Sequence, residues 1–191
     1  QTEDSASASL KKQNGTYSEL TGNYGFTFDQ RDKAFMPTSG SIITFGQSIP
    51  IAADKAFIVN TISSSFYKSL SENIIGSTKI YLASINGLGG EDVRISKRRG
   101  ISSSRLRGFE KNKVGPVDGS DHVGGNYVAS LNFETNLPNL LPENSNADIG
   151  LFLDFGNVWG VDYDSSIDDS NEIRSSTGIT LNWLSPIGPL N

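Results

Sequence analysis

The chain has 191 residues, no cysteine and a hydrophobic content of 36%. No stretch approaches the roughly 20 apolar residues of a membrane-spanning helix, and without cysteine neither a disulfide framework nor a thiolate metal site can form. The net charge of −5 argues against a dedicated nucleic-acid binder. These exclusions do not rule out a membrane β-barrel, because the strands of such a barrel are half polar.

Period-two alternation between turn clusters dominates the chain and predicts an all-β antiparallel meander. The predicted strands cover residues 17–31, 41–51, 55–69, 73–85, 125–136, 147–159 and 173–183. A partial strand is also expected at 4–12. Strands of roughly 10–14 residues exceed the ~5–6 of soluble proteins and match the ~9–11 that cross a bilayer. The pattern therefore favours a transmembrane barrel, and a soluble sandwich with long strands is the alternative.

The last three strands have the clearest alternation. Residues 125–136 place Leu131 and Phe133 on an apolar face, and the next two strands continue that face with Leu151, Leu153, Phe155, Ile179, Leu181 and Trp183. Tyr127, Trp159 and Trp183 lie near strand ends, as an interfacial aromatic girdle requires. In the strand at 55–69 the facing is ambiguous, because Phe57 and Val59 compete with Ile58, Ile62 and Phe66 for the apolar face.

A long loop, about residues 86–124, separates the fourth and fifth strands. Its segment from Arg94 to Lys113 holds eight of the 16 Lys and Arg residues and one acid, Glu110. A local charge of +7 thus stands in a background of −12. We expect either a solvated loop or a loop folded against an acidic barrel interior.

The second interpretation names a site. The motif Arg107, Gly108 and Phe109 would supply a planar guanidinium, a flexible backbone position and an apolar anchor. Its expected partners on the polar faces of the following strands are Asp154, Phe152, Glu134 and Asn132. Asp154 and Phe152 would offer a carboxylate and a ring to one guanidinium, Glu134 would be the second acid, and Asn132 a neutral acceptor.

Other candidate sites are weak. His122 is the only histidine, so a metal site is not expected, and no nucleophile motif or cofactor signature occurs. The run Asp162–Glu172 resembles a calcium loop but has Ile167 where the sharp-turn glycine belongs, so we interpret it as a solvated acidic loop. The chain is not expected to be an enzyme.

Several motifs in order resemble the bacterial surface antigen family. They are Leu106-Arg107-Gly108-Phe109, Phe28-Asp29-Gln30-Arg31-Asp32 with Phe35-Met36-Pro37-Thr38-Ser39-Gly40, Val114-Gly115-Pro116, Gly124-Gly125-Asn126-Tyr127, Leu153-Asp154-Phe155-Gly156-Asn157-Val158-Trp159 and Trp183-Leu184-Ser185-Pro186-Ile187-Gly188-Pro189. One departure concerns Asn132, where the family commonly has Glu. Glu134, two residues on and on the same face, could substitute.

The resemblance implies a 16-stranded barrel in the bacterial outer membrane, of which residues 1–191 form a single fragment covering about strands 8–14. It implies folding and insertion of outer-membrane β-barrel proteins as the central barrel subunit of the assembly machinery. The implied partners are outer-membrane lipids, nascent β-barrel proteins and accessory assembly lipoproteins, with no nucleic acid and no cofactor. The alternatives are a related translocation or two-partner secretion pore and a passive porin-like channel.

Overall fold

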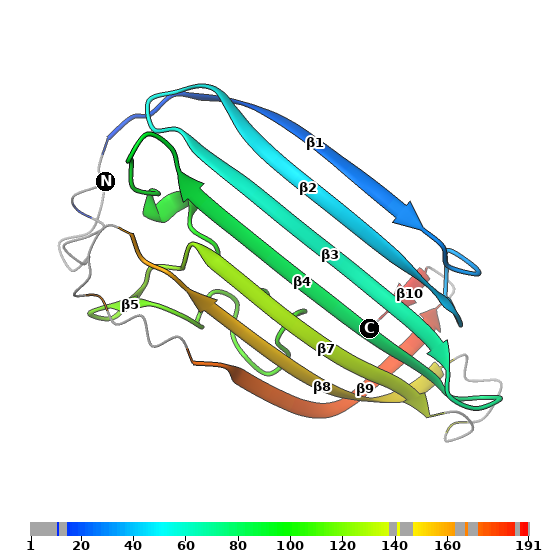
Figure 1. Cartoon of the computed structure of the whole chain (residues 1–191). Coiled ribbons are helices and arrows are strands. Elements are labelled where there is room, and N and C mark those ends of the chain that lie inside the picture. Colours follow the sequence, from blue (N-terminus) through cyan, green and yellow to red (C-terminus); the bar gives the residue numbers. More distant parts are fainter. Residues whose placement is uncertain are drawn as a thin grey trace.

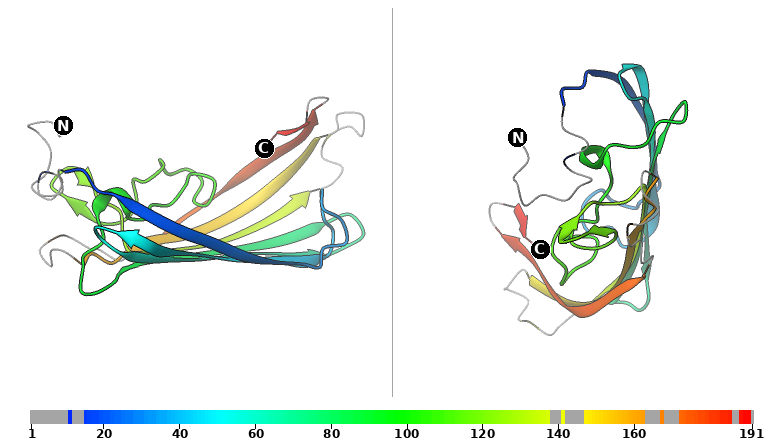
Figure 2. Two further views of the ribbon diagram at one scale, coloured as in Figure 1. Left: turned by 90° about the horizontal axis from the view of Figure 1, so that it is seen from above. Right: turned by 90° about the vertical axis from the view of Figure 1, so that its left-hand side faces the viewer.

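In a computed structural model of the chain, a single curved sheet carries a long loop on its concave side (Figures 1 and 2). The description covers residues 11, 15–137, 141, 147–162, 167, 172–185 and 188–190, with backbone alone at 147–148, 182–185 and 188–190. The partial strand expected at 4–12 and the side chain of Trp183 lie outside the described residues. No helix among the described residues is long and apolar enough to cross a membrane.

Eight strands form the sheet, each antiparallel to its neighbour, in the order β1-β2-β3-β4-β7-β8-β9-β10. Their bounds are β1 Glu19–Asp29, β2 Gly40–Ala53, β3 Phe57–Ser69, β4 Ile75–Gly87, β7 Tyr127–Leu137, β8 Ala147–Trp159, β9 Arg174–Ser185 and β10 Gly188–Leu190. The seven predicted strands and the meander are confirmed. The additional β10 was missed because Pro189, which pairs with Leu184, breaks the sequence pattern of a strand.

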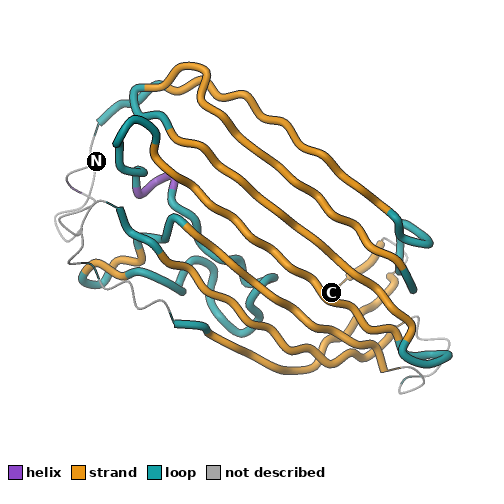
Figure 3. Tube along the Cα trace, viewed as in Figure 1, coloured by secondary structure: helices purple, strands orange, loops and turns teal. Residues whose placement is uncertain are grey.

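The long loop runs over residues 88–126, two residues later at each end than predicted (Figure 3). It starts later because Asn86 and Gly87 still pair with Ile58 and Phe57 on β3. Within the loop are a short 3-10 helix, η1 Ile95–Lys97, and a two-stranded ribbon of β5 Val117–Asp118 and β6 Asp121–His122. A second pairing, between Arg99 and Gly125, closes the base of the loop.

The two faces of the sheet differ as the alternation predicts. Leu151, Leu153 and Phe133 are exposed on the convex face, whereas Asp154 and Asn132 are buried on the concave face. Because successive side chains point to opposite faces, one register fixes both sets. The apolar outward face predicted for the last three strands is confirmed for the side chains that the structure describes.

The hydrophobic core lies between the concave face and the loop. Loop residues Ile101, Leu106 and Val114 pack on sheet residues Ala83, Val128 and Val158. A second cluster joins Val93 of the loop to Phe57, Val59 and Ile85. The facing of β3 is thereby settled: Phe57 and Val59 point to the loop, whereas Ile62 and Phe66 are exposed on the convex face.

The turn between β1 and β2 is built around one carboxylate. Asp32 accepts hydrogen bonds from the Thr38 hydroxyl at 2.6 Å, the Thr38 backbone N–H at 3.0 Å and the Ser39 backbone N–H at 3.2 Å. The Thr38 hydroxyl, with these backbone groups, lowers the pKa of Asp32 to about 2. Arg31 pairs with Asp29 at 2.7 Å beside it. This part of the family-like motif is therefore a self-contained turn.

Candidate functional site

The loop tip is shaped by local hydrogen bonds. The Ser102 carbonyl accepts from the backbone N–H groups of Arg105 and Leu106 at 3.0 and 3.1 Å, which forms a tight turn. Leu106 is fully buried against the sheet and so fixes the direction of the next residue. Gly108 has a φ of 84°, a left-handed conformation that residues with a side chain rarely adopt. The turn therefore presents Arg107 toward the concave face.

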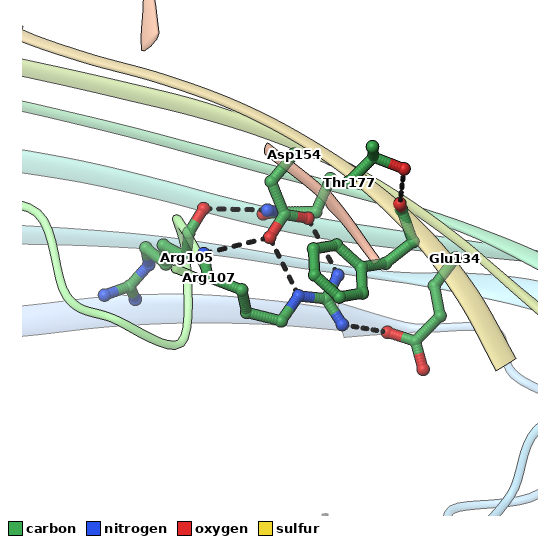
Figure 4. A network of polar contacts seen from close by, with 7 residues as sticks. Arg105, Arg107, Glu134, Asp154 and Thr177 are labelled. Atoms are coloured by element: carbon green, nitrogen blue, oxygen red, sulfur yellow. Dashed lines mark hydrogen bonds and ion pairs between the residues drawn. The ribbon is translucent and has the colours of Figure 1, made fainter. Parts of the chain in front are cut away.

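Arg107 binds both predicted acids (Figure 4). Its Nε donates to Asp154 Oδ2 at 2.8 Å and its Nη2 donates to Asp154 Oδ1 at 2.7 Å, a bidentate pair. Its backbone N–H donates to the same Asp154 Oδ2 at 3.1 Å. Nη1 donates to Glu134 Oε2 at 3.0 Å, and the guanidinium carbon lies 3.8 Å from the centre of the Phe152 ring. The guanidinium thus joins two strands, β7 and β8, to the loop.

The other predicted residues also lie at this site. Phe109 packs, partly buried, against the hydrophobic core under the loop. Asn132 has a different partner from the one predicted: its Nδ2 donates to the Arg105 backbone carbonyl at 2.7 Å, where an acceptor for Arg107 was expected. The Arg105 guanidinium lies 3.6 Å from the centre of the Tyr81 ring. We call this group, centred on Arg107 and Asp154, the deep anchor.

The sheet makes room for the loop at one residue. A side-chain Cβ on Gly156 would lie 2.5 Å from Ile101 Cδ1 and 3.3 Å from Leu106 Cδ2. Contacts under about 3 Å force one partner to move, and both partners here are buried. Gly156 therefore permits the close approach of loop and strand that the deep anchor requires.

A second anchor was missed from the sequence. Arg98, whose side chain is fully buried, forms an ion pair with Asp162 in the segment after β8. It also donates to the backbone carbonyls of Gly160 and Val93, each at 3.1 Å. Asp162 Oδ2 in turn accepts from the Val93 backbone N–H at 3.0 Å and from Asn126 Nδ2 at 2.9 Å. We call this group the rim anchor.

The rim anchor corrects, at Asp162 and Ile167, the interpretation of Asp162–Glu172 as a solvated acidic loop. Glu172 is exposed, and residues 163–166 and 168–171 lie outside the described residues. Asp162 is bound to the basic loop, and Ile167 is buried. Burial raises the pKa of Asp162, but the hydrogen bonds from Asn126 and Val93 and the charge of Arg98 outweigh it, so the pKa lies below the usual value. Arg98 belongs to a run of basic residues that alternation cannot orient, so the sequence offered no signal for this pair.

Two further basic residues of the loop contact the beginning of the sheet. Lys97 forms an ion pair with Glu19 on β1, and the Arg94 guanidinium lies 3.6 Å from the centre of the Tyr17 ring. The basic loop is therefore held at separate places by separate partners. Among the described residues no group of His, Asp and Glu could hold a metal ion, and the site is an arrangement of ion pairs and packing.

A curved antiparallel meander with an anchored inward loop and an apolar convex face defines a class of membrane barrel. The profile of the Omp85 superfamily domain matches residues 1–191, so the chain belongs to this superfamily, whose bacterial members are outer-membrane proteins. The predicted resemblance is confirmed.

The particular relatives share one name. The chain is 28% identical over 193 residues to outer membrane protein assembly factor BamA of Neorickettsia risticii, covering 98% of this chain and 26% of the relative. It is 30% identical over 200 residues to BamA of Nitratidesulfovibrio vulgaris, covering 98% and 24%. The crystal structure of Haemophilus ducreyi BamA lacking POTRA domains 1–3 superposes with a TM-score of 0.76 at 25% identity, covering 87% of this chain and 36% of that one. The chain is similar to a BamA barrel and spans about a quarter of these curated relatives' length.

Proposed function

We propose that this barrel segment serves the folding and insertion of β-barrel proteins into the outer membrane. The observation that carries the proposal is the docking of Leu106–Phe109 on the concave face through Arg107 and Asp154, in a chain that matches assembly factors over 98% of its length. The proposed partners are nascent β-barrel proteins, outer-membrane lipids and accessory assembly lipoproteins. No covalent step or cofactor is involved, so the protein is proposed not to be an enzyme.

The role of the deep anchor follows from its geometry. Arg107 bridges Asp154 on β8 and Glu134 on β7 while its own loop covers the concave face. An anchored loop holds these strands at a fixed curvature, because the ion pairs and the core beneath them are lost together if the sheet flattens. We propose that a barrel able to admit client strands elsewhere in its wall needs this part of the wall to stay rigid.

A client-folding assay tests the proposal. The protein is reconstituted in lipid vesicles, a urea-unfolded β-barrel client is added, and the protease-resistant folded client is measured over time. We expect the protein to accelerate client folding and Arg107→Met to slow it markedly. Arg174→Met is the matched control, because Arg174 pairs with Glu172 in an exposed position.

Two outcomes contradict the proposed activity, and a third contradicts the role of the deep anchor in it. Vesicles that conduct ions through the protein but fold the client no faster than protein-free vesicles would indicate a porin-like channel. Client that crosses the vesicle membrane without inserting would indicate a translocation or secretion pore. Equal client folding by Arg107→Met and Arg174→Met would separate the deep anchor from the function.

A further inference from the structure

A row of polar side chains crosses the convex face on four neighbouring strands. Tyr24, Gln47, Asn60 and Ser84 occupy paired positions on β1 to β4. The Tyr24 hydroxyl donates to Gln47 Oε1, Gln47 Nε2 donates to Asn60 Oδ1, and Asn60 Nδ2 donates to Ser84 Oγ at 3.4 Å. The four side chains thus form one chain of hydrogen bonds.

The surroundings of this row are apolar. Phe26, Ile62 and Leu82 are exposed on one side of it, and Ile49 is exposed on the other. In an outer-membrane barrel this face meets hydrocarbon, where polar groups must find partners other than water. Each side-chain amide nitrogen carries two N–H donors, and one from Gln47 and one from Asn60 are used within the row. The row therefore has donors to spare and faces a medium that supplies none of the usual solvent acceptors.

A groove adjoins the row where the spare donors lie. It has a volume of about 240 Å³ and is open to the convex side. Asn60 and Ser84 line it together with the aliphatic side chains of Ile62 and Leu82. Tyr127 and Trp159, which continue the row of Asn60 and Ser84 onto β7 and β8, complete the lining. The two aromatic rings are stacked with their centroids 5.7 Å apart. The groove is thus apolar along its length with hydrogen-bond donors at its edge.

We propose that this groove binds one acyl chain of an ester-linked glycerophospholipid, with the ester carbonyl accepting a hydrogen bond from the Asn60 amide. An ester carbonyl is an acceptor without a donor, which complements the spare N–H groups, and the attached chain matches the apolar walls. The groove is continuous with the lipid-facing surface, so a lipid reaches it without opening the fold. The inference rests on the outer-membrane location of the barrel and not on its proposed role in client folding.

Quenching of Trp159 fluorescence tests lipid binding in this groove directly, because the Trp159 ring lines the groove. The protein carries Trp183→Phe, and any tryptophan outside this chain is also replaced by Phe, so that Trp159 is the single reporter. Vesicles of unbrominated ester lipid receive a small, equal fraction of one of two phospholipids with brominated chains, identical except for ester or ether linkage. We expect the ester lipid to occupy the groove about 2- to 10-fold more, the value of one hydrogen bond.

Three variants test whether lipid binding is specific to this groove. Ser84→Leu fills the groove and should reduce quenching by both lipids to the level of bulk contact. Thr78→Leu is the matched control, since Thr78 is half-buried like Ser84, lies on the same face of β4 outside the groove and should leave quenching unchanged. Asn60→Leu removes the donor but keeps the apolar walls, and should abolish the ester preference while quenching persists.

Equal quenching of the unsubstituted protein by ester and ether lipids overturns the hydrogen bond to the ester. Equal quenching of Ser84→Leu and Thr78→Leu overturns the groove as the binding site. Trp159 that no brominated lipid quenches means that something other than lipid covers the groove, which also overturns it. Client folding is not measured in any arm, so these outcomes are independent of the test of the proposed function.

Discussion

The deep anchor and the rim anchor differ in which partner of the ion pair is buried. At the deep anchor the acid Asp154 is fully buried and Arg107 retains 24% of its side-chain exposure. At the rim anchor Arg98 is fully buried and Asp162 retains 27%. Both guanidiniums belong to the same basic loop. An uncompensated charge costs most where it is buried, so the sensitive residue is the arginine at one anchor and the aspartate at the other.

The largest effect is expected from Arg107→Met. The substitution leaves Asp154 buried without a counter-charge and removes the ion-pair partner of Glu134. We expect it to cost about 3–5 kcal/mol in loop docking. Native-state hydrogen exchange of the Leu106 backbone N–H in the vesicle-reconstituted protein measures this free energy. Asp154→Asn in the same chain should recover part of the loss, and unchanged protection in the single variant would contradict the bidentate pair.

The second-largest effect is expected at the rim anchor, where the arginine is the buried partner. Asp162→Asn removes the counter-charge of the buried Arg98 guanidinium, which still donates to the carbonyls of Val93 and Gly160. We therefore expect a loss of about 1–3 kcal/mol in docking of the loop base. Arg98→Met should cost less, because the remaining carboxylate is partly solvated and keeps its N–H donors. Hydrogen exchange of the Val93 backbone N–H reports both. A larger loss for Arg98→Met than for Asp162→Asn would contradict the comparison.

The rim anchor should also respond to acid. The folded pKa of Asp162 is depressed, so its carboxylate contributes its full stabilisation above the unfolded value of about 3.9 and loses it as the pH falls through the lower, folded pKa. Protection of the Val93 N–H should therefore be constant between about pH 7 and 5 and decline only below about pH 4. A decline already between pH 7 and 5 would assign the anchor to another group. Asp162→Asn should remove the acid-dependent part.

The smallest effect belongs to an exposed ion pair. Glu91, near the beginning of the same loop, pairs at 3.1 Å with Lys55, in the turn between β2 and β3, and both side chains are half-exposed. Glu91→Gln should change loop docking by less than about 1 kcal/mol, because solvent screens such a pair. Equal losses from this variant and from Asp162→Asn, measured by the same exchange experiment, would mean that burial does not separate the anchors from ordinary surface pairs.

The deep anchor could be predicted because its partners lie on regular strands. Asp154 and Phe152 are two residues apart on β8, so alternation places them on one face once Leu153 is assigned to the other. The rim anchor joins two irregular segments, Arg98 in η1's cap and Asp162 after β8, and no periodicity orients either. The polar row escaped for a related reason: Gln47 and Asn60 interrupt the apolar face of their strands, and a pattern sought in hydrophobic residues passes over them.

The sequence distance between partners sets an order of events during folding. Asp154 follows Arg107 by 47 residues and Asp162 follows Arg98 by 64. The guanidiniums of Arg107 and Arg98 therefore have no acid of their anchors to bind until β8 and the segment after it are in place. Because loop closure over such distances is entropically costly and each of these ion pairs forms only when its acid is in place, we expect the two anchors to form late. A loop with both anchors formed therefore indicates that β7 and β8, which follow it in the chain, have already paired.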